Sequence, residues 1–61
     1  MAEYDFVVNL KEGDIISIAY GCWGVVKSVE PCGDKIFVTV TLCSKDVEVI
    51  YDLDEIVPVR R

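Results

Sequence analysis

The side chains that most often do chemistry in enzymes are scarce in this sequence. The chain has no histidine, which removes the commonest general base and the Ser-His and Cys-His nucleophile pairs. Asp52, Asp54 and Glu55 form a carboxylate cluster, but adjacent acids on a polar turn are typical of a solvated cap. Gly21 and Gly24 are not followed by the Lys-Ser/Thr of a phosphate-binding loop. The sequence therefore predicts a protein that is not an enzyme.

The three cysteines are Cys22, Cys32 and Cys43, which are odd in number and widely spaced. An odd number leaves a disulfide framework incomplete, and no CxxC pair is present to hold a metal. We therefore expect no metal and no cofactor, and we interpret the cysteines as small apolar residues that are buried or half-buried.

A second set of residues has the chemistry of a binding surface. The chain has six aromatic residues, and each one alone is more often a core residue. Together they exceed what so small a core can bury, and exposed rings beside carboxylates are typical of protein interfaces. The sequence predicts a partner-binding site made of Tyr20, Trp23, Phe37, Glu48, Ile50, Asp52 and Asp54. Tyr4 and Tyr51 are further candidate anchors.

The net charge points to the class of partner. The formal charge is −5, and the lysines are scattered singly along the chain. Binding to a phosphate backbone rests on Lys and Arg, so nucleic acid is a disfavoured partner. Carboxylates would instead steer a basic protein toward the aromatic anchors. A homodimer that uses Phe37 and Ile50 would draw on the same features.

Length and hydropathy indicate one small, folded domain, residues 1–61. The chain is 52% hydrophobic, which is too apolar for disorder. Its first residues, MAEYDFVV, lack the basic start and long apolar run of a signal peptide, and no stretch is long enough to cross a membrane. We therefore expect a cytoplasmic protein with no membrane partner.

Alternating apolar residues and turn signals predict an all-β protein that must position these side chains. Residues 35–43 alternate most regularly, with Ile36, Val38, Val40 and Leu42 assigned to the core. A glycine corner is expected at residues 20–24, and one 3-10 turn at residues 52–56. The predicted strands are residues 3–10, 15–19, 25–29, 35–43, 47–51 and 57–59, the last one at an edge because Pro58 lacks an N–H.

Three segments resemble those of Src-homology-3-like barrels. Residues 2–6 resemble an A-x-Y-D-F motif, residues 10–16 an L-x-x-G-D-x-I motif, and Gly24-Val25-Val26 the G-V-V start of a strand in KOW and Tudor-type relatives. The resemblance implies a small five-stranded barrel with one short 3-10 turn before the last strand. The tandem tryptophans and the S-x-x-Y segment of the proline-peptide groove are absent, so the resemblance implies the fold and not that ligand.

Two other functions follow from family resemblance. The KOW likeness implies RNA or ribosome contacts through the loops around residues 20–24, with Tyr20 and Trp23 stacking on bases. Val47-Glu48-Val49-Ile50-Tyr51 is similar to the V-Q-I-Y strand of type II dihydrofolate reductases, but a carboxylate at Glu48 would repel an anionic cofactor. The interpretation that the residues favour is a non-catalytic protein-interaction module that binds a protein, with a basic partner or a second copy as candidates.

Overall fold

The computed structural model describes residues 3–61. It contains β-strands joined by short turns and one single-turn helix, in the order β1 (Glu3–Phe6), η1 (Val7–Asn9), β2 (Ile15–Ala19), β3 (Cys22–Cys32), β4 (Lys35–Leu42), β5 (Lys45–Asp52) and β6 (Ile56–Arg60).

The strict alternation of β4 sets the two faces of the sheet. Ile36, Val38 and Val40 have no exposed surface, whereas the residues between them are half-buried on the opposite side. This confirms the core assignment for these three residues, and Leu42 packs against the same core while half-buried. Successive side chains point to opposite faces of a strand, so a core on one side leaves the other side free.

The chain reverses between β2 and β3 in only two residues, Tyr20 and Gly21. Gly21 has a φ of 76°, which a residue without a Cβ adopts at little cost. The glycine corner predicted for residues 20–24 is therefore shorter than expected, and Gly24 lies inside β3. A register shift at Lys27 marks a β-bulge that bends this long strand.

The first strand is shorter than the predicted residues 3–10, because the chain turns into η1 after Phe6. The Oδ1 atom of Asp5 accepts hydrogen bonds from the backbone N–H of Phe6 at 2.7 Å and from Asn9 Nδ2 at 3.1 Å. Such local bonds offer the backbone an alternative to a sheet ladder. The turn places Val7 fully inside the core, where it donates its N–H to the carbonyl oxygen of Glu55 at 3.0 Å.

The end of the chain also differs from the prediction. Residues 52–55 form a plain turn, closed by a 3.2 Å bond from the Glu55 N–H to the Asp52 carbonyl, so the 3-10 turn lies at residues 7–9 and not before the last strand. The predicted edge strand at 57–59 is the inner strand β6, which pairs with β1 and β2. Pro58 is tolerated there because the pairing with β2 begins only at Val59.

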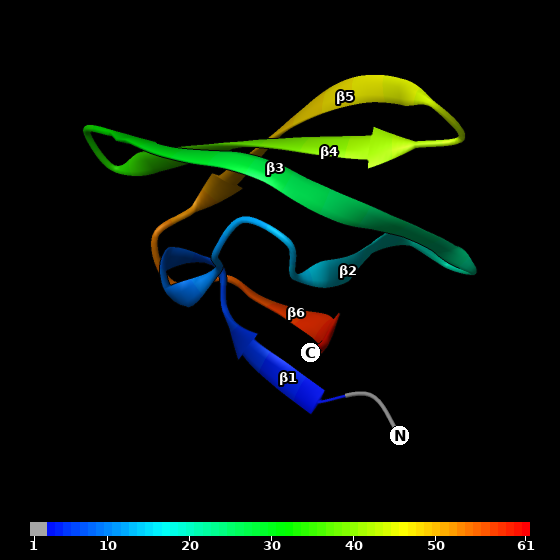
Figure 1. Cartoon of the computed structure of the whole chain (residues 1–61). Coiled ribbons are helices and arrows are strands. Elements are labelled where there is room, and N and C mark those ends of the chain that lie inside the picture. The colour runs from blue at the N-terminus through cyan, green and yellow to red at the C-terminus, as the bar shows by residue number, and fades with distance from the viewer. Residues whose placement is uncertain (1–2) are drawn as a thin grey trace.

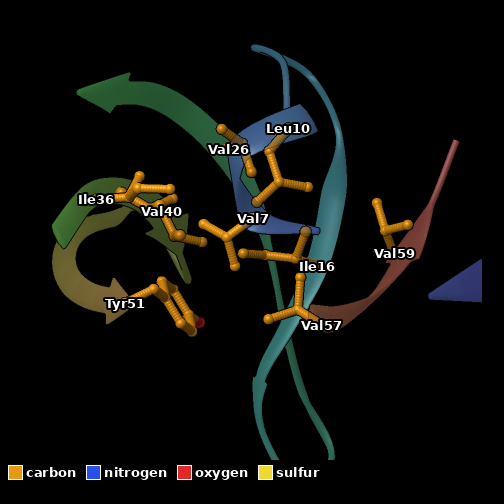
Figure 2. Packing of buried hydrophobic residues seen from close by; sticks show 10 residues of the cluster. Val7, Leu10, Ile16, Val26, Ile36, Val40, Tyr51, Val57 and Val59 are labelled. Atoms are coloured by element: carbon orange, nitrogen blue, oxygen red, sulfur yellow. The ribbon is translucent and has the colours of Figure 1, made fainter. Parts of the chain in front are cut away.

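The strands form one antiparallel sheet in the order β1-β6-β2-β3-β4-β5. The all-β prediction is confirmed. The sheet among residues 3–61 has six strands, unlike the five-stranded barrel that the resemblance implies, and it is open between its edges β1 and β5. Figure 1 shows β3, β4 and β5 above β2, β6 and β1. The core fills the space between these halves, and Figure 2 shows Val7 between the side chains of β4 and those of β2 and β6.

Candidate functional site

The side of β3, β4 and β5 that faces away from the core carries four of the predicted site residues. We call this side the outer face. Phe37 of β4 lies directly opposite Glu30 of β3 and Ile50 of β5. Opposed residues in an antiparallel pair have Cβ atoms about 4.5–5.5 Å apart, close enough for their side chains to interact. The register thus places Phe37 and Ile50 side by side, although 13 positions separate them in the sequence.

Carboxylates surround this apolar pair. Glu48 lies opposite Thr39 and is the diagonal neighbour of Phe37 on the same face. Glu30, Phe37, Glu48 and Ile50 are hereafter the Phe37 patch. Ile50 is 57% exposed and Phe37 is half-buried, so the patch offers a flat apolar centre between two negative charges.

The other two carboxylates of the outer face are already paired. Asp46 accepts hydrogen bonds from Lys27 Nζ at 2.7 Å and from Thr41 Oγ1 at 2.9 Å, and Asp52 forms an ion pair with Lys35. The Lys27 ammonium and then the Thr41 hydroxyl lower the pKa of Asp46, and Asp52 raises the pKa of Lys35. Within residues 3–61, Glu30 and Glu48 have no such ion pair.

Tyr20 and Trp23 lie apart from the Phe37 patch, at the β2–β3 hairpin. Tyr20 is at the tip and is 97% exposed. Trp23 is the second residue of β3, whereas Glu30 lies near the opposite end of that strand. The Arg60 guanidinium lies 4.3 Å from the centroid of the Trp23 ring. The structure therefore divides the predicted site into a hairpin-tip pair and the Phe37 patch.

The remaining candidates fall into different environments. Asp54 lies in the exposed turn after β5, near Asp52 but outside the sheet. Tyr51 is only 8% exposed, and this burial, followed by the charge of Glu55, raises the pKa of its hydroxyl. Tyr51 is therefore a core residue and not an anchor, whereas Tyr4 is 69% exposed.

Sequence reasoning missed a second apolar surface on the other half of the sheet. Phe6 lies opposite Ile56, and Tyr4 lies opposite Pro58. Phe6 and Ile56 are 49% and 56% exposed. No signal in the sequence marks Phe6 and Ile56 as exposed, because an apolar residue in a strand pattern is expected to face the core.

A polar cluster ties the last residue to two distant segments. Arg61 forms ion pairs with Asp5 at 2.7 Å and with Asp14 at 3.5 Å. The pKa of Asp5 is lowered, first by the Arg61 guanidinium and then by the bonds from Asn9 and the Phe6 N–H. Together with Val8, Leu10 and the loop at residues 11–14, these groups line a depression of mixed polar and apolar character. One guanidinium thus pairs with two carboxylates from distant segments, which gives the cluster a structural role.

The cysteines differ from the expectation of burial. Cys22, Cys32 and Cys43 are all exposed free thiols at strand ends or turns. In the described part of the chain, no group of three His, Cys, Asp or Glu side chains is arranged to hold a metal ion. No helix among residues 3–61 has the length and apolar character needed to cross a membrane.

Comparison of the chain with protein-family models, with curated proteins and with solved structures gives no match.

Proposed function

We propose that this chain is a non-catalytic protein-binding module that holds a basic protein segment on the Phe37 patch. The observation that carries the proposal is the register of β3, β4 and β5, which puts Phe37 and Ile50 between Glu30 and Glu48, two carboxylates that form no ion pair within residues 3–61. Apolar anchors supply most of the binding free energy of an interface, and complementary charge supplies orientation and a fast encounter.

The charges on the outer face favour a basic partner over an acidic one. Lys27 and Lys35 are held by Asp46 and Asp52, so they offer little free positive charge to a ligand. Glu30 and Glu48 are free to pair with Lys or Arg of a partner. An acidic partner would be repelled by Glu30 and Glu48 at short range, so the patch discriminates between partners as well as binding them.

The same proposal includes a fold family. We propose that the open six-stranded sheet is a variant of the Src-homology-3-like barrel. One support is the bulged strand β3, which joins the two halves of the sheet by pairing with both β2 and β4. A second support is the hydrogen bond from the Val7 N–H to the Glu55 carbonyl, which brings the end of β1 to the turn after β5. An experimental structure in which the Val7 N–H and the Glu55 carbonyl are far apart would contradict it.

Two matched isoleucines test the binding proposal. Ile50 and Ile56 are the same residue type with nearly equal exposure, 57% and 56%, on different halves of the sheet. Tagged wild-type chain, Ile50→Ser and Ile56→Ser are used to capture proteins from native lysate, with identification by mass spectrometry and affinity measurement on the purified partner. We expect Ile50→Ser to weaken binding at least about tenfold, as loss of an interface anchor does, and Ile56→Ser to bind normally. Loss of binding in Ile56→Ser alone would move the site to β1 and β6.

RNA binding is a second candidate because of the hairpin tip. A fully exposed Tyr20 beside the Trp23–Arg60 stack is a surface on which unpaired bases could stack. Single-stranded RNA is titrated at physiological salt while the fluorescence of Trp23 is followed. Binding that Tyr20→Ala and Arg60→Ala abolish, and that Ile50→Ser leaves intact, would favour this function over protein binding.

A further inference from the structure

Strand β5 is a long, regular edge. It pairs along all eight of its residues with β4, without a register shift, and among residues 3–61 no strand pairs with its other side. It contains no Pro, Gly or bulge of the kind that protects edge strands in other proteins. The opposite edge, β1, has only four residues. Strand β5 therefore presents the longer row of backbone N–H and C=O groups without sheet partners.

The Phe37 patch reaches this edge. Glu48 and Ile50 belong to β5 itself, and both point to the outer face together with Asp46 and Asp52. Any strand added beside β5 would place alternate side chains on the same face, directly opposite these residues. An added strand would thus meet a negative charge at Glu48 and an apolar side chain two residues further on, at Ile50.

A second copy of the chain is a poor occupant. Two β5 strands related by a two-fold axis pair antiparallel, with outer-face residues opposite outer-face residues. Every such register that pairs five or more residues sets two carboxylates against each other: Asp46 with Asp52, Glu48 with Glu48, Asp46 with Glu48, or Glu48 with Asp52. Like charges directly opposite in a sheet are destabilising. Three of these four registers set Glu48, which has no ion pair within residues 3–61, against another carboxylate. The fourth sets Asp46 and Asp52, each of which holds a lysine, against each other, so the edge disfavours its own copy.

We infer that β5 accepts a basic, extended peptide segment as an additional antiparallel strand, with a Lys or Arg opposite Glu48 and an apolar side chain opposite Ile50. This inference rests on the proposed function and specifies the partner and the mode of binding. Main-chain hydrogen bonds along β5 would supply affinity, and the two outer-face side chains would supply selectivity. The row formed by Glu30, Phe37 and Ile50 would gain a fourth member from the peptide.

The test uses a synthetic peptide, Lys-Thr-Val-Thr-Lys-Val-Lys-Thr. Read antiparallel to β5, its lysines face Asp52, Glu48 and Asp46, and its first valine faces Ile50. The matched acidic peptide has Glu in place of each Lys. Binding to the whole chain is followed by NMR, together with hydrogen exchange of the β5 amides. We expect the basic peptide alone to bind, and to slow exchange at alternate residues of β5 and nowhere in β1.

Two peptide variants separate strand addition from simple charge attraction. In an added edge strand, alternate amides point toward β5 and the others point to solvent. N-methylation of one alternate set should therefore abolish binding, and N-methylation of the other set should leave it intact. If neither set matters, strand addition is overturned while a basic partner on the Phe37 patch still stands.

Charge reversal on the protein provides the matched controls. Glu48→Lys should lower the affinity for the basic peptide about tenfold and allow the acidic peptide to bind, since the substitution reverses one charge of a directly opposed pair. Glu3→Lys makes the same change in net charge on the opposite edge, β1, and should leave affinity within about twofold. An equal loss of affinity in both variants would show that only the net charge matters, and this would overturn the inference.

Two further outcomes also overturn it. Concentration-dependent dimerisation with protection of the β5 amides in the absence of peptide would make a second copy the occupant. If a natural partner binds in a way that requires Ile50 but leaves the β5 amides unprotected from exchange, strand addition alone is overturned. If Ile50→Ser does not change the binding of the partner, the proposed function itself is overturned.

Discussion

At the residue scale, Gly24 shows how closely the backbone of β3 packs against side chains of β4. It is buried in β3, opposite Ile16 of β2. A Cβ at this position would lie 2.9 Å from Leu42 Cδ2 and would also press on Val40 Cγ1. Its backbone does not have a positive φ, so glycine is needed here for space and not for conformation. The residue predicted as part of a backbone corner is a packing residue.

We expect Gly24→Ala to lower the free energy of unfolding by about 1–3 kcal/mol, as overpacking of a core does. Urea unfolding monitored by the fluorescence of Trp23 measures the effect. Val40→Ala removes one of the two side chains that the new methyl group would meet, so the double variant should lose less stability than the two single losses combined. Strict additivity would show that the methyl group is accommodated elsewhere.

At the element scale, the β4–β5 hairpin combines regular strands with an unfavourable turn. Its two loop residues, Cys43 and Ser44, have φ values of 50° and 66°. Two successive residues in this left-handed region define a type I′ turn, which favours Asn-Gly because side chains with a Cβ are strained there. The cross-strand pairs of β4 and β5 therefore maintain the register of the hairpin, whereas the strained residues of the turn destabilise it.

Replacing the turn with better residues should stabilise the protein. We expect Cys43→Asn combined with Ser44→Gly to raise the free energy of unfolding by about 1–2 kcal/mol, since both positions then tolerate a positive φ. Thermal and urea unfolding measure the gain. Cys22→Asn changes another exposed cysteine that has no positive φ and should alter stability by less than about 0.5 kcal/mol. An equal gain in that control would trace the effect to loss of a thiol.

At the scale of the whole molecule, few residues form the core and much apolar surface stays exposed to solvent. A domain of this length buries only about 60% of the surface of its unfolded chain, and large side chains such as Tyr20, Ile50 and Ile56 stay exposed. The Arg61 ion pairs join β1 and the loop before β2 to the end of the chain. These partly exposed ion pairs therefore add to the core a small contribution to stability.

This arrangement predicts a loss of stability in acid. The folded-state pKa of Asp5 lies below its ordinary value of 3.8, because Arg61 favours the carboxylate. The stabilisation is complete above the unfolded-state pKa and disappears as the pH falls through the lower, folded-state pKa. Asp5→Asn should therefore flatten the fall in melting temperature between about pH 5 and pH 2. Asp54→Asn, which removes an exposed turn carboxylate, is the control for the change in charge, and an equal flattening there would contradict the role of Arg61.

The sequence by itself determined the all-β class, the approximate places of the strands and the two faces of β4, because alternation depends only on the residues of one strand. It also indicated that some aromatic side chains would be exposed, as Tyr20 is, because a short chain has too small a core. It could not show that β6 is an inner strand, since pairing partners come from distant parts of the chain. For the same reason only the tertiary structure decided that Trp23 lies beneath Arg60 and that Phe37 meets Ile50. The register between strands sets these contacts, and a shift of one residue would turn every side chain of a strand to the other face.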